Sequence, residues 1–323
     1  MAHRADDLID RRRLRRKLSF WRITAIALAA LAIIGSALLM TGGVAGLSVD
    51  HIAQVRIEGT ITEDEDLIDT LEKVGKSARV KGVILTIDSP GGTTAGGEAI
   101  YDAVRRLAAQ KPVVAQVGTL AASAGYMIAS ASDHIVARQS SIVGSIGVLV
   151  QFPDVTGLME KLGIKLESVK SSPLKAEPSP FNPTTEEERA MLRALILDSY
   201  DWFVDLVADR RPLSRDEVVA LADGSIFTGR QALARKLVDS LGGEEEAVAW
   251  LAGQGVGDKL EVIEWKPASS GSIFLAEALA RTVADRLGLS DNSSALLRAI
   301  GAERLFLDGL VSVWHPEKPV WGD

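Results

Sequence analysis

The sequence predicts an α/β fold in which a layered, mostly parallel sheet forms the core. From Ile52 onward, strand-like stretches alternate with helix-like stretches, which is the pattern of βαβ units. Two of the strand-like stretches, Val83–Ile87 and Val113–Val117, are continuous apolar runs, as expected of strands buried on both faces. The 323 residues are 47% hydrophobic, which is enough to build one large core or two modest ones.

Short elements follow one another through the first half of this region. Alternating apolar residues predict a strand over Ile52–Ile57, and periodic leucine and isoleucine among polar residues predict a helix over Glu63–Lys76. The two buried strands come next along the chain, each followed by a helix. We expect the other helices at Gly97–Gln110, Ala124–Ser130 and Leu158–Leu162, and the other strands at His134–Ala137, Val143–Val150 and Lys165–Val169.

One long helix is predicted in the second half, over Thr185–Arg211. Its start has the form of a capping box, because Glu188 follows Thr185 at the third position. Ser214 opens another helix with the same cap chemistry. Residues from about Ala268 onward have the composition of a tail.

An uncharged stretch near the N-terminus, Ile23–Leu47, predicts a membrane anchor. A hydrocarbon core about 30 Å thick needs roughly 20 apolar helical residues, so this stretch is long enough to span it. The basic run Arg11–Lys17 precedes it, and the positive-inside rule therefore keeps the N-terminus in the cytoplasm and exports the rest. A cleaved signal peptide and a buried core helix are the alternatives; the stretch is long for the first and lacks a clean Ala-x-Ala site.

The predicted organisation is a basic cytoplasmic tail at 1–22, the anchor at 23–47, an exported domain at 48–267 and a C-terminal tail at 268–323.

Composition excludes several classes of protein. The chain has no cysteine, so it forms no disulfide, thiolate zinc site or cysteine nucleophile. Residues 1–22 carry a net charge of +5 within a total of −7, and the remaining −12 argues against nucleic acid as the main partner. Neither phosphate-binding glycine motif occurs, nor does His-Glu-x-x-His, so we expect no cofactor and no metal.

Serines and a lysine in glycine-rich turns point instead to a serine hydrolase. Ser123 follows a buried strand and enters a helix among alanine and glycine, which would let a substrate backbone approach closely. The alternative is an ordinary N-cap serine. A histidine base is poorly supplied, because His134 alone among the four histidines lies in the core, where we expect a packed or solvent-facing role. A lysine made neutral by burial can replace histidine, and Lys175 lies among apolar neighbours, with Lys170 as its rival.

Ser145 and two glycines complete the candidate site. Ser145 could hold the lysine amine, and the N–H groups of a double-glycine turn at Gly91 and Gly92 could form an oxyanion hole. Each feature also has a purely structural interpretation. Ser145 could be a turn serine, the two glycines could form a plain turn, and Lys175 could be an ordinary loop lysine.

Three segments together resemble the signal peptide peptidase A (protease IV) family: Asp88–Gly92, Ala121–Tyr126 and Gly144–Val148. Asp223–Ala232 and Leu237–Gly243 resemble the C-terminal signature of that family. The resemblance covers roughly residues 50–255 and implies the ClpP/crotonase-like layered fold, with one catalytic module per chain.

The resemblance also implies roles for individual residues. Ser123 and Lys175 match the catalytic dyad, Ser145 the serine that contacts the lysine, and Gly92 the oxyanion glycine. Ala124 departs from the glycine that the family often has there, and the loop that carries Lys175 differs from common versions. The resemblance further implies homo-oligomeric rings whose sites combine the serine of one subunit with the lysine of its neighbour.

These observations predict a membrane-anchored serine endopeptidase that degrades cleaved signal peptides and unfolded segments. It would be a single-pass protein of the bacterial inner membrane, with its catalytic domain on the extracytoplasmic side. Two alternatives remain. One is a noncatalytic oligomeric scaffold or quality-control protein on the same fold. The other is a crotonase-like acyl-thioester enzyme, against which predicted export argues because acyl-CoA is cytoplasmic.

Overall fold

The computed structural model describes residues 21, 24, 49–267 and 311–313. Contacts divide the chain into two units, residues 1–50 and 51–323, and the fold described below belongs to the second. The predicted anchor lies outside the described residues except for Thr24, as does the predicted tail except for residues 311–313. Within the part of the chain that the structure describes, no helix is long and apolar enough to cross a membrane.

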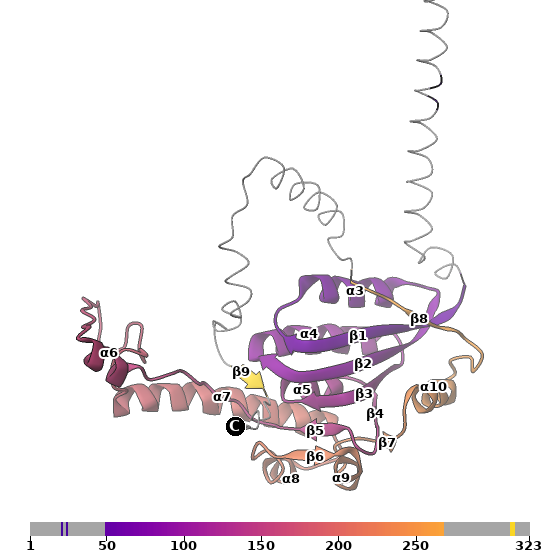
Figure 1. The fold of residues 1–323 in the computed structure, drawn as a ribbon. Helices are drawn as coiled ribbons and strands as arrows, with labels where there is room; N and C mark the ends of the chain where they lie inside the picture. The colour runs from indigo at the N-terminus through magenta and orange to yellow at the C-terminus, as the bar shows by residue number, and fades with distance from the viewer. Residues whose placement is uncertain (1–20, 22–23, 25–48, 268–310, 314–323) are drawn as a thin grey trace, which may run out of the picture. The chain divides into compact units, whose positions relative to one another are not determined.

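A mixed sheet of nine strands, counted over the described residues, forms the centre of the second unit (Figure 1). Its strands are His51–Ile61 (β1), Val80–Thr93 (β2), Val113–Ala122 (β3), His134–Ala137 (β4), Ile142–Gly144 (β5), Ile226–Thr228 (β6), Ser240–Leu241 (β7), Val262–Glu264 (β8) and Val311–Val313 (β9). The main path runs β6-β5-β3-β2-β1-β8, with β4 between β3 and β7, and with β9 beside β2. All pairs are parallel except β5–β6 and β2–β9. The α/β prediction is confirmed.

Helices cover both faces of this sheet. They are Glu65–Lys76 (α3), Thr94–Ala108 (α4), Ala124–Ser130 (α5), Thr156–Leu162 (α6), Glu186–Arg210 (α7), Arg215–Val219 (α8), Gly229–Ala234 (α9) and Glu244–Gly253 (α10). Alternate residues of β1 to β3 pack on one face against α3, α4, α5 and the C-terminal half of α7. The intervening residues, such as Ile52, Ile84 and Val114, pack on the other face against α10.

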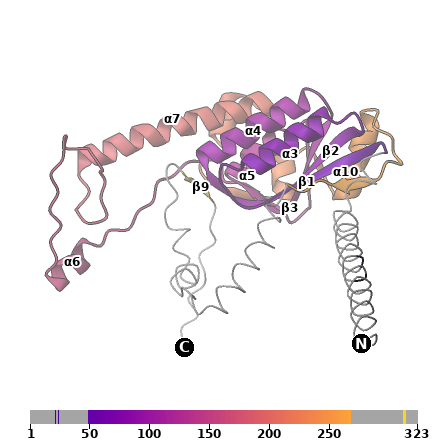
Figure 2. The ribbon, with the colours of Figure 1, turned by 90° about the horizontal axis from the view of Figure 1, so that it is seen from above.

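Helix α7 is embedded at one end only. Phe203, Val204 and Val207, in its C-terminal half, are fully buried in the main core. Its N-terminal half extends past the sheet, and the connection between α6 and α7 lies at that far end in both views (Figures 1 and 2). The predicted capping box is confirmed, because Thr185 and Glu188 exchange hydrogen bonds at the helix start.

Three predicted elements differ from the structure. Strand β2 continues through Pro90, Gly91 and Gly92, where we predicted a turn, because it stays paired with β1 there. Strand β5 ends at Gly144, where left-handed backbone turns the chain. The strand predicted at Lys165–Val169 is wrong: the segment is irregular and its residues are exposed, since no neighbouring strand pairs with it.

Candidate active site

Ser123 lies at the sharp junction between β3 and α5. Its backbone is left-handed, with φ 58° and ψ −121°, a conformation that is rare for residues other than glycine. Its N–H donates to the Gly144 carbonyl at 2.8 Å, and its carbonyl accepts the Met127 N–H at 2.9 Å. Although Ser123 occupies the N-cap position, its hydroxyl makes no capping bond to α5, so helix capping does not explain this serine.

Small residues let α5 pack closely behind Ser123. A Cβ on Gly125 would lie 2.9 Å from the Ser89 carbonyl oxygen, so a side chain there would force the backbone apart. A Cβ on Gly97 of α4 would lie 3.1 Å from the Ala124 methyl group. The alanine that departs from the family pattern is therefore accommodated by a glycine on the neighbouring helix.

Ser145 lies beside Ser123 at the ends of two neighbouring strands. Ala122 of β3 pairs with Gly144 of β5, and the two serines follow directly after this pair. Ser145 also has left-handed backbone, with φ 54°, and its N–H donates to the Ser225 carbonyl at 2.7 Å. Tertiary pairing thus brings together two serines that are distant in the sequence.

Gly91 and Gly92 lie at the end of β2, and the two glycines make different contacts. The Gly91 N–H donates to Ser89 Oγ at 3.1 Å, and its φ is 105°. At Gly92 a Cβ would lie 1.8 Å from the Ile61 carbonyl oxygen, so only glycine fits there. On the other side, Gly91 and Gly92 pair in antiparallel register with β9.

Lys175 is not brought to Ser123 within one chain. It lies in the connection between α6 and α7, which both views place at the far end of α7 from α5 (Figures 1 and 2). Its side chain is exposed, and its ammonium group makes no hydrogen bond or ion pair to any described residue. A single subunit therefore presents the candidate serines and glycines together without the candidate base.

Lys170, the rival base, is held by Glu177. The two side chains form a close ion pair, in which Lys170 is largely buried and Glu177 almost completely so. The hydrogen bond from Lys170 holds the pKa of Glu177 below its ordinary value. The Lys170 side chain is therefore engaged by Glu177 within the connection between α6 and α7.

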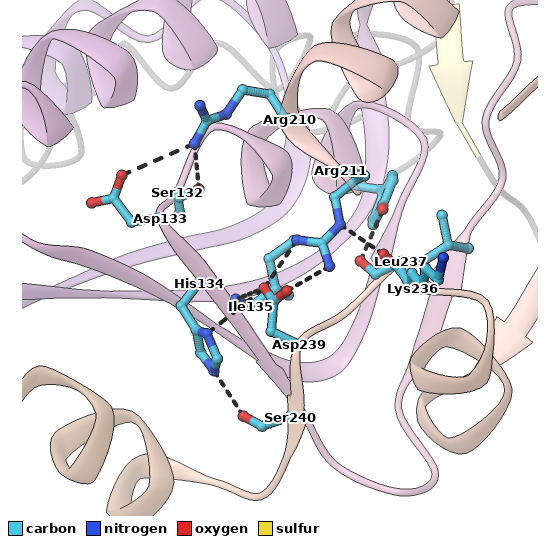
Figure 3. Close-up of polar contacts among 11 residues, drawn as sticks. Ser132, Asp133, His134, Ile135, Arg210, Arg211, Lys236, Leu237, Asp239 and Ser240 are labelled. Carbon is cyan, nitrogen blue, oxygen red and sulfur yellow. Dashed lines mark hydrogen bonds and ion pairs between the residues drawn. The ribbon is translucent and has the colours of Figure 1, made fainter. Parts of the chain in front are cut away.

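His134 takes part in a group that resembles a catalytic triad but is used structurally (Figure 3). Its Nε2 lies 2.9 Å from Ser240 Oγ, and its Nδ1 lies 3.9 Å from Asp239 Oδ2, which is too far for a hydrogen bond. The Asp239 carboxylate instead receives two hydrogen bonds from Arg211, at 2.7 and 2.9 Å. The imidazole stacks on Trp250 with centroids 5.0 Å apart, and burial lowers the pKa of His134. The group joins β4 to β7.

Comparison with known proteins identifies two matching family models. Peptidase family S49 matches residues 105–256, and Clp protease matches residues 50–143. The second match agrees with the layered α/β fold.

Relatives match over 64–75% of the chain. A protein of Methanocaldococcus jannaschii that is named as a protease is 39% identical, over 64% of this chain and 67% of its own. A protein of Synechocystis, also named as a protease, is 36% identical over 75% of this chain and 89% of its own. A protein of Enterococcus faecium, named as signal peptide peptidase SppA, is 33% identical over 71% of this chain and 67% of its own. Among solved structures, a mutant of a membrane-bound stomatin-specific protease is 16% identical with a TM-score of 0.48, over 68% of this chain and 99% of that one.

Proposed function

The chain belongs to peptidase family S49, a family of serine-type proteases, and we propose that it is a membrane-anchored endopeptidase with a Ser123–Lys175 dyad. The observation that carries this proposal is the left-handed backbone of Ser123 at the strand–helix junction, which capping does not explain. Strain of this kind clusters at active sites, where surrounding structure holds a reactive group in place.

The proposed mechanism is acyl transfer to the serine. Ser123 Oγ attacks the peptide carbonyl while the Lys175 amine takes its proton and later gives it to the leaving amine. Water then hydrolyses the acyl-enzyme. The Gly92 N–H, with the N–H of Ala124 that follows the nucleophile, would bind the oxyanion, each donor contributing about 3 kcal/mol. Ser145, at the neighbouring strand end, would orient the lysine.

We propose that the lysine comes from a neighbouring subunit in a homo-oligomer. The segment that carries Lys175 lies away from Ser123 of the same chain, so the site needs a second copy. Large apolar side chains are exposed along α6, this segment and the nearby half of α7, a pattern typical of protein contact surfaces; they are Leu158, Leu162, Ile164, Leu166, Val169, Phe181, Leu195 and Leu197. A pocket of about 660 Å³, lined by residues such as Phe152, Leu192 and Ile196, lies in the same region.

The substrate and location are proposed from the sequence and the relatives. The apolar stretch at 23–47 would anchor the chain in the inner membrane and leave residues 48–267 outside the cytoplasm. Signal peptides left in the bilayer would be the substrates, as the name of the Enterococcus relative indicates for that protein.

Cleavage of a synthetic signal peptide tests the proposal. The full chain in detergent should cleave the peptide and react with a fluorophosphonate probe, whereas Ser123→Ala should lose about 10⁴-fold or more in kcat and fail to react. A Ser123→Ala variant as active as wild type would rule out the assigned nucleophile. An inert but assembled wild type would favour the noncatalytic scaffold, and tight binding of coenzyme A would favour the acyl-thioester enzyme.

A further inference from the structure

The hydroxyl of Ser89 is fully buried beside the proposed oxyanion strand. Ser89 is 0% exposed, and its Oγ donates to the Gly59 carbonyl at 2.7 Å. The same oxygen accepts the Gly91 N–H at 3.1 Å. One hydroxyl therefore joins β1 to the segment of β2 that carries both candidate glycines.

These bonds occur where the regular sheet is interrupted. The register between β1 and β2 shifts between Glu58 and Thr60, and Gly59 at the shift has a left-handed φ of 75°. Gly91 on the other strand has φ 105°. Because an irregular pair leaves backbone groups without ladder partners, the Ser89 hydroxyl supplies the missing donor and acceptor.

Ser89 also contacts the helix that follows the nucleophile. A Cβ on Gly125 would lie 2.9 Å from the Ser89 carbonyl oxygen and 3.3 Å from its Cβ. Ser89 pairs with Ala121 of β3 as well. It therefore lies between the two parts of the site that must be aligned, the oxyanion strand and the turn that carries Ser123.

The two bonds also distinguish the glycines. Because the Gly91 N–H is directed to Ser89 Oγ, it is engaged within the protein rather than available to a substrate. Gly92, whose missing side chain lets it pack against the Ile61 carbonyl, is therefore the glycine to which we assign the oxyanion donor.

We propose that Ser89 is a positioning residue of the protease site, whose hydroxyl holds Gly91 and thereby aims the Gly92 N–H at the oxyanion. The proposal rests on the proposed function. Ser89 does not touch the substrate, so its effect appears in the transition state rather than in ground-state binding.

Ser141 provides a matched control. It is also a buried serine, 2% exposed, whose Oγ donates to a carbonyl, that of Gly118 at 2.6 Å. It likewise accepts a backbone N–H, that of Arg138 at 3.0 Å. Ser89→Ala and Ser141→Ala each leave one carbonyl and one N–H without their partner, so both should lower the melting temperature to a similar extent.

Kinetics on the full-length variants separates the two serines. Ser89→Ala should lower kcat about 10- to 100-fold with little change in KM, because the oxyanion donor is displaced. It should also lower the binding affinity for a peptide aldehyde inhibitor by the same factor as kcat/KM, because the hemiacetal oxygen of the inhibitor occupies the oxyanion site. Ser141→Ala should leave both close to wild type.

Equal kcat and aldehyde affinity in the two variants would overturn the proposal. If Ser89→Ala does not fold, Ser89→Cys fills the same site with a somewhat larger side chain that hydrogen-bonds weakly, and it should show the same selective loss in kcat. A Ser89→Cys variant with normal kcat would also overturn the proposal. A wild type that does not cleave, or an active Ser123→Ala, refutes the proposed function itself, whereas the Ser89 assignment alone fails when wild type cleaves and Ser89 variants match it.

Discussion

At the residue scale, two neighbouring serines share an uncommon backbone conformation. Ser123 and Ser145 have φ values of 58° and 54°, and each such residue costs of order 1–3 kcal/mol. Hydrogen bonds from their N–H groups to the Gly144 and Ser225 carbonyls hold them in place. Since these are backbone interactions, alanine at either position should keep the fold and remove only the hydroxyl.

The two lysines near the start of α7 should respond differently to substitution. Lys175→Ala should lower kcat about 10³-fold or more, because the neutral amine of Lys175 is the proposed base. Lys170→Ala should stay active and lose stability, because it leaves the nearly buried Glu177 carboxylate without its partner. Peptide cleavage and thermal unfolding of both variants check this prediction. An inactive Lys170→Ala beside an active Lys175→Ala would reverse the assignment.

Motifs in the sequence pointed to Ser123, Ser145 and Gly92, because small residues around strand ends are visible without a structure. The resemblance assigned the oxyanion role to Gly92, but the hydrogen bond from the Gly91 N–H to the Ser89 hydroxyl could not be predicted from the sequence. No motif singled out Ser89, because burial of a serine between two strands is set by tertiary packing. The position of Lys175 was also not predictable, since it depends on the direction of α7.

At the element scale, two arginines hydrogen-bond the C-terminal end of α5, the helix that follows Ser123. The Arg210 guanidinium donates to the Ser130 and Ser132 carbonyls at 3.2 and 3.1 Å, the second being visible in Figure 3. Arg105 donates to the Ala131 carbonyl at 2.6 Å. Carbonyls at a helix C-terminus lack intrahelical partners and carry partial negative charge, so both arginines stabilise α5. They also fix α4 and α7 against the helix that begins after Ser123.

The junction of β4 and β7 should make stability depend on pH. Burial lowers the pKa of His134, so the unfolded chain binds its proton more readily than the folded chain. This contribution is fully present above about pH 6.5, the unfolded value, and is lost as pH falls below it. His134→Gln cannot titrate but can still bond Ser240, and it should therefore flatten the fall in melting temperature between about pH 7.5 and 5. An unchanged slope in this variant would contradict the prediction.

Asp239 adds a second step, at lower pH, to the dependence of stability on pH. Burial alone would raise its pKa, but the hydrogen bonds and charge of Arg211 outweigh burial and lower it. Its contribution is present above the unfolded value of about 3.9 and is lost as pH falls through the lower folded value. The His134 substitution should leave this step in place, which separates the two groups in the same titration.

Local sequence patterns predicted those helices and strands that are determined by their own residues. The capping boxes at Thr185 and Ser214 and the buried runs of β2 and β3 are of this kind. The strand predicted at Lys165–Val169 is wrong because a strand needs a pairing partner, and none of the strands that the structure describes pairs with this segment. The short strands β6 to β8 exist through pairing with distant segments, which no local pattern reveals.

At the scale of the whole molecule, β9 pairs with β2 at Gly92, the proposed oxyanion glycine. Val311–Val313 lie antiparallel to Gly91–Thr93, the same backbone edge that an extended substrate would need. A chain ending at residue 310 should therefore have a KM lower by about 3-fold or more, because the competing strand is absent. A chain ending at residue 313 keeps β9 and serves as the control. Equal KM values for the two truncations would show that β9 does not compete with substrate.

The separation of Lys175 from Ser123 leads to a prediction about the assembly. If the lysine of one subunit serves the serine of the next, Ser123→Ala and Lys175→Ala oligomers are each inactive, but mixed oligomers contain sites with both groups intact. Random assembly of equal amounts would restore about a quarter of the sites, because each site needs an intact serine from one subunit and an intact lysine from its neighbour. The two proteins would be unfolded or dissociated, mixed and reassembled, and cleavage measured against wild type treated in the same way. A double variant carrying both substitutions, mixed with Ser123→Ala, contains no intact serine, should stay inactive and controls for contaminating activity. If the two single variants do not complement although exchange is demonstrated, the lysine must reach the serine of its own chain, and the segment between α6 and α7 would have to fold back across α7.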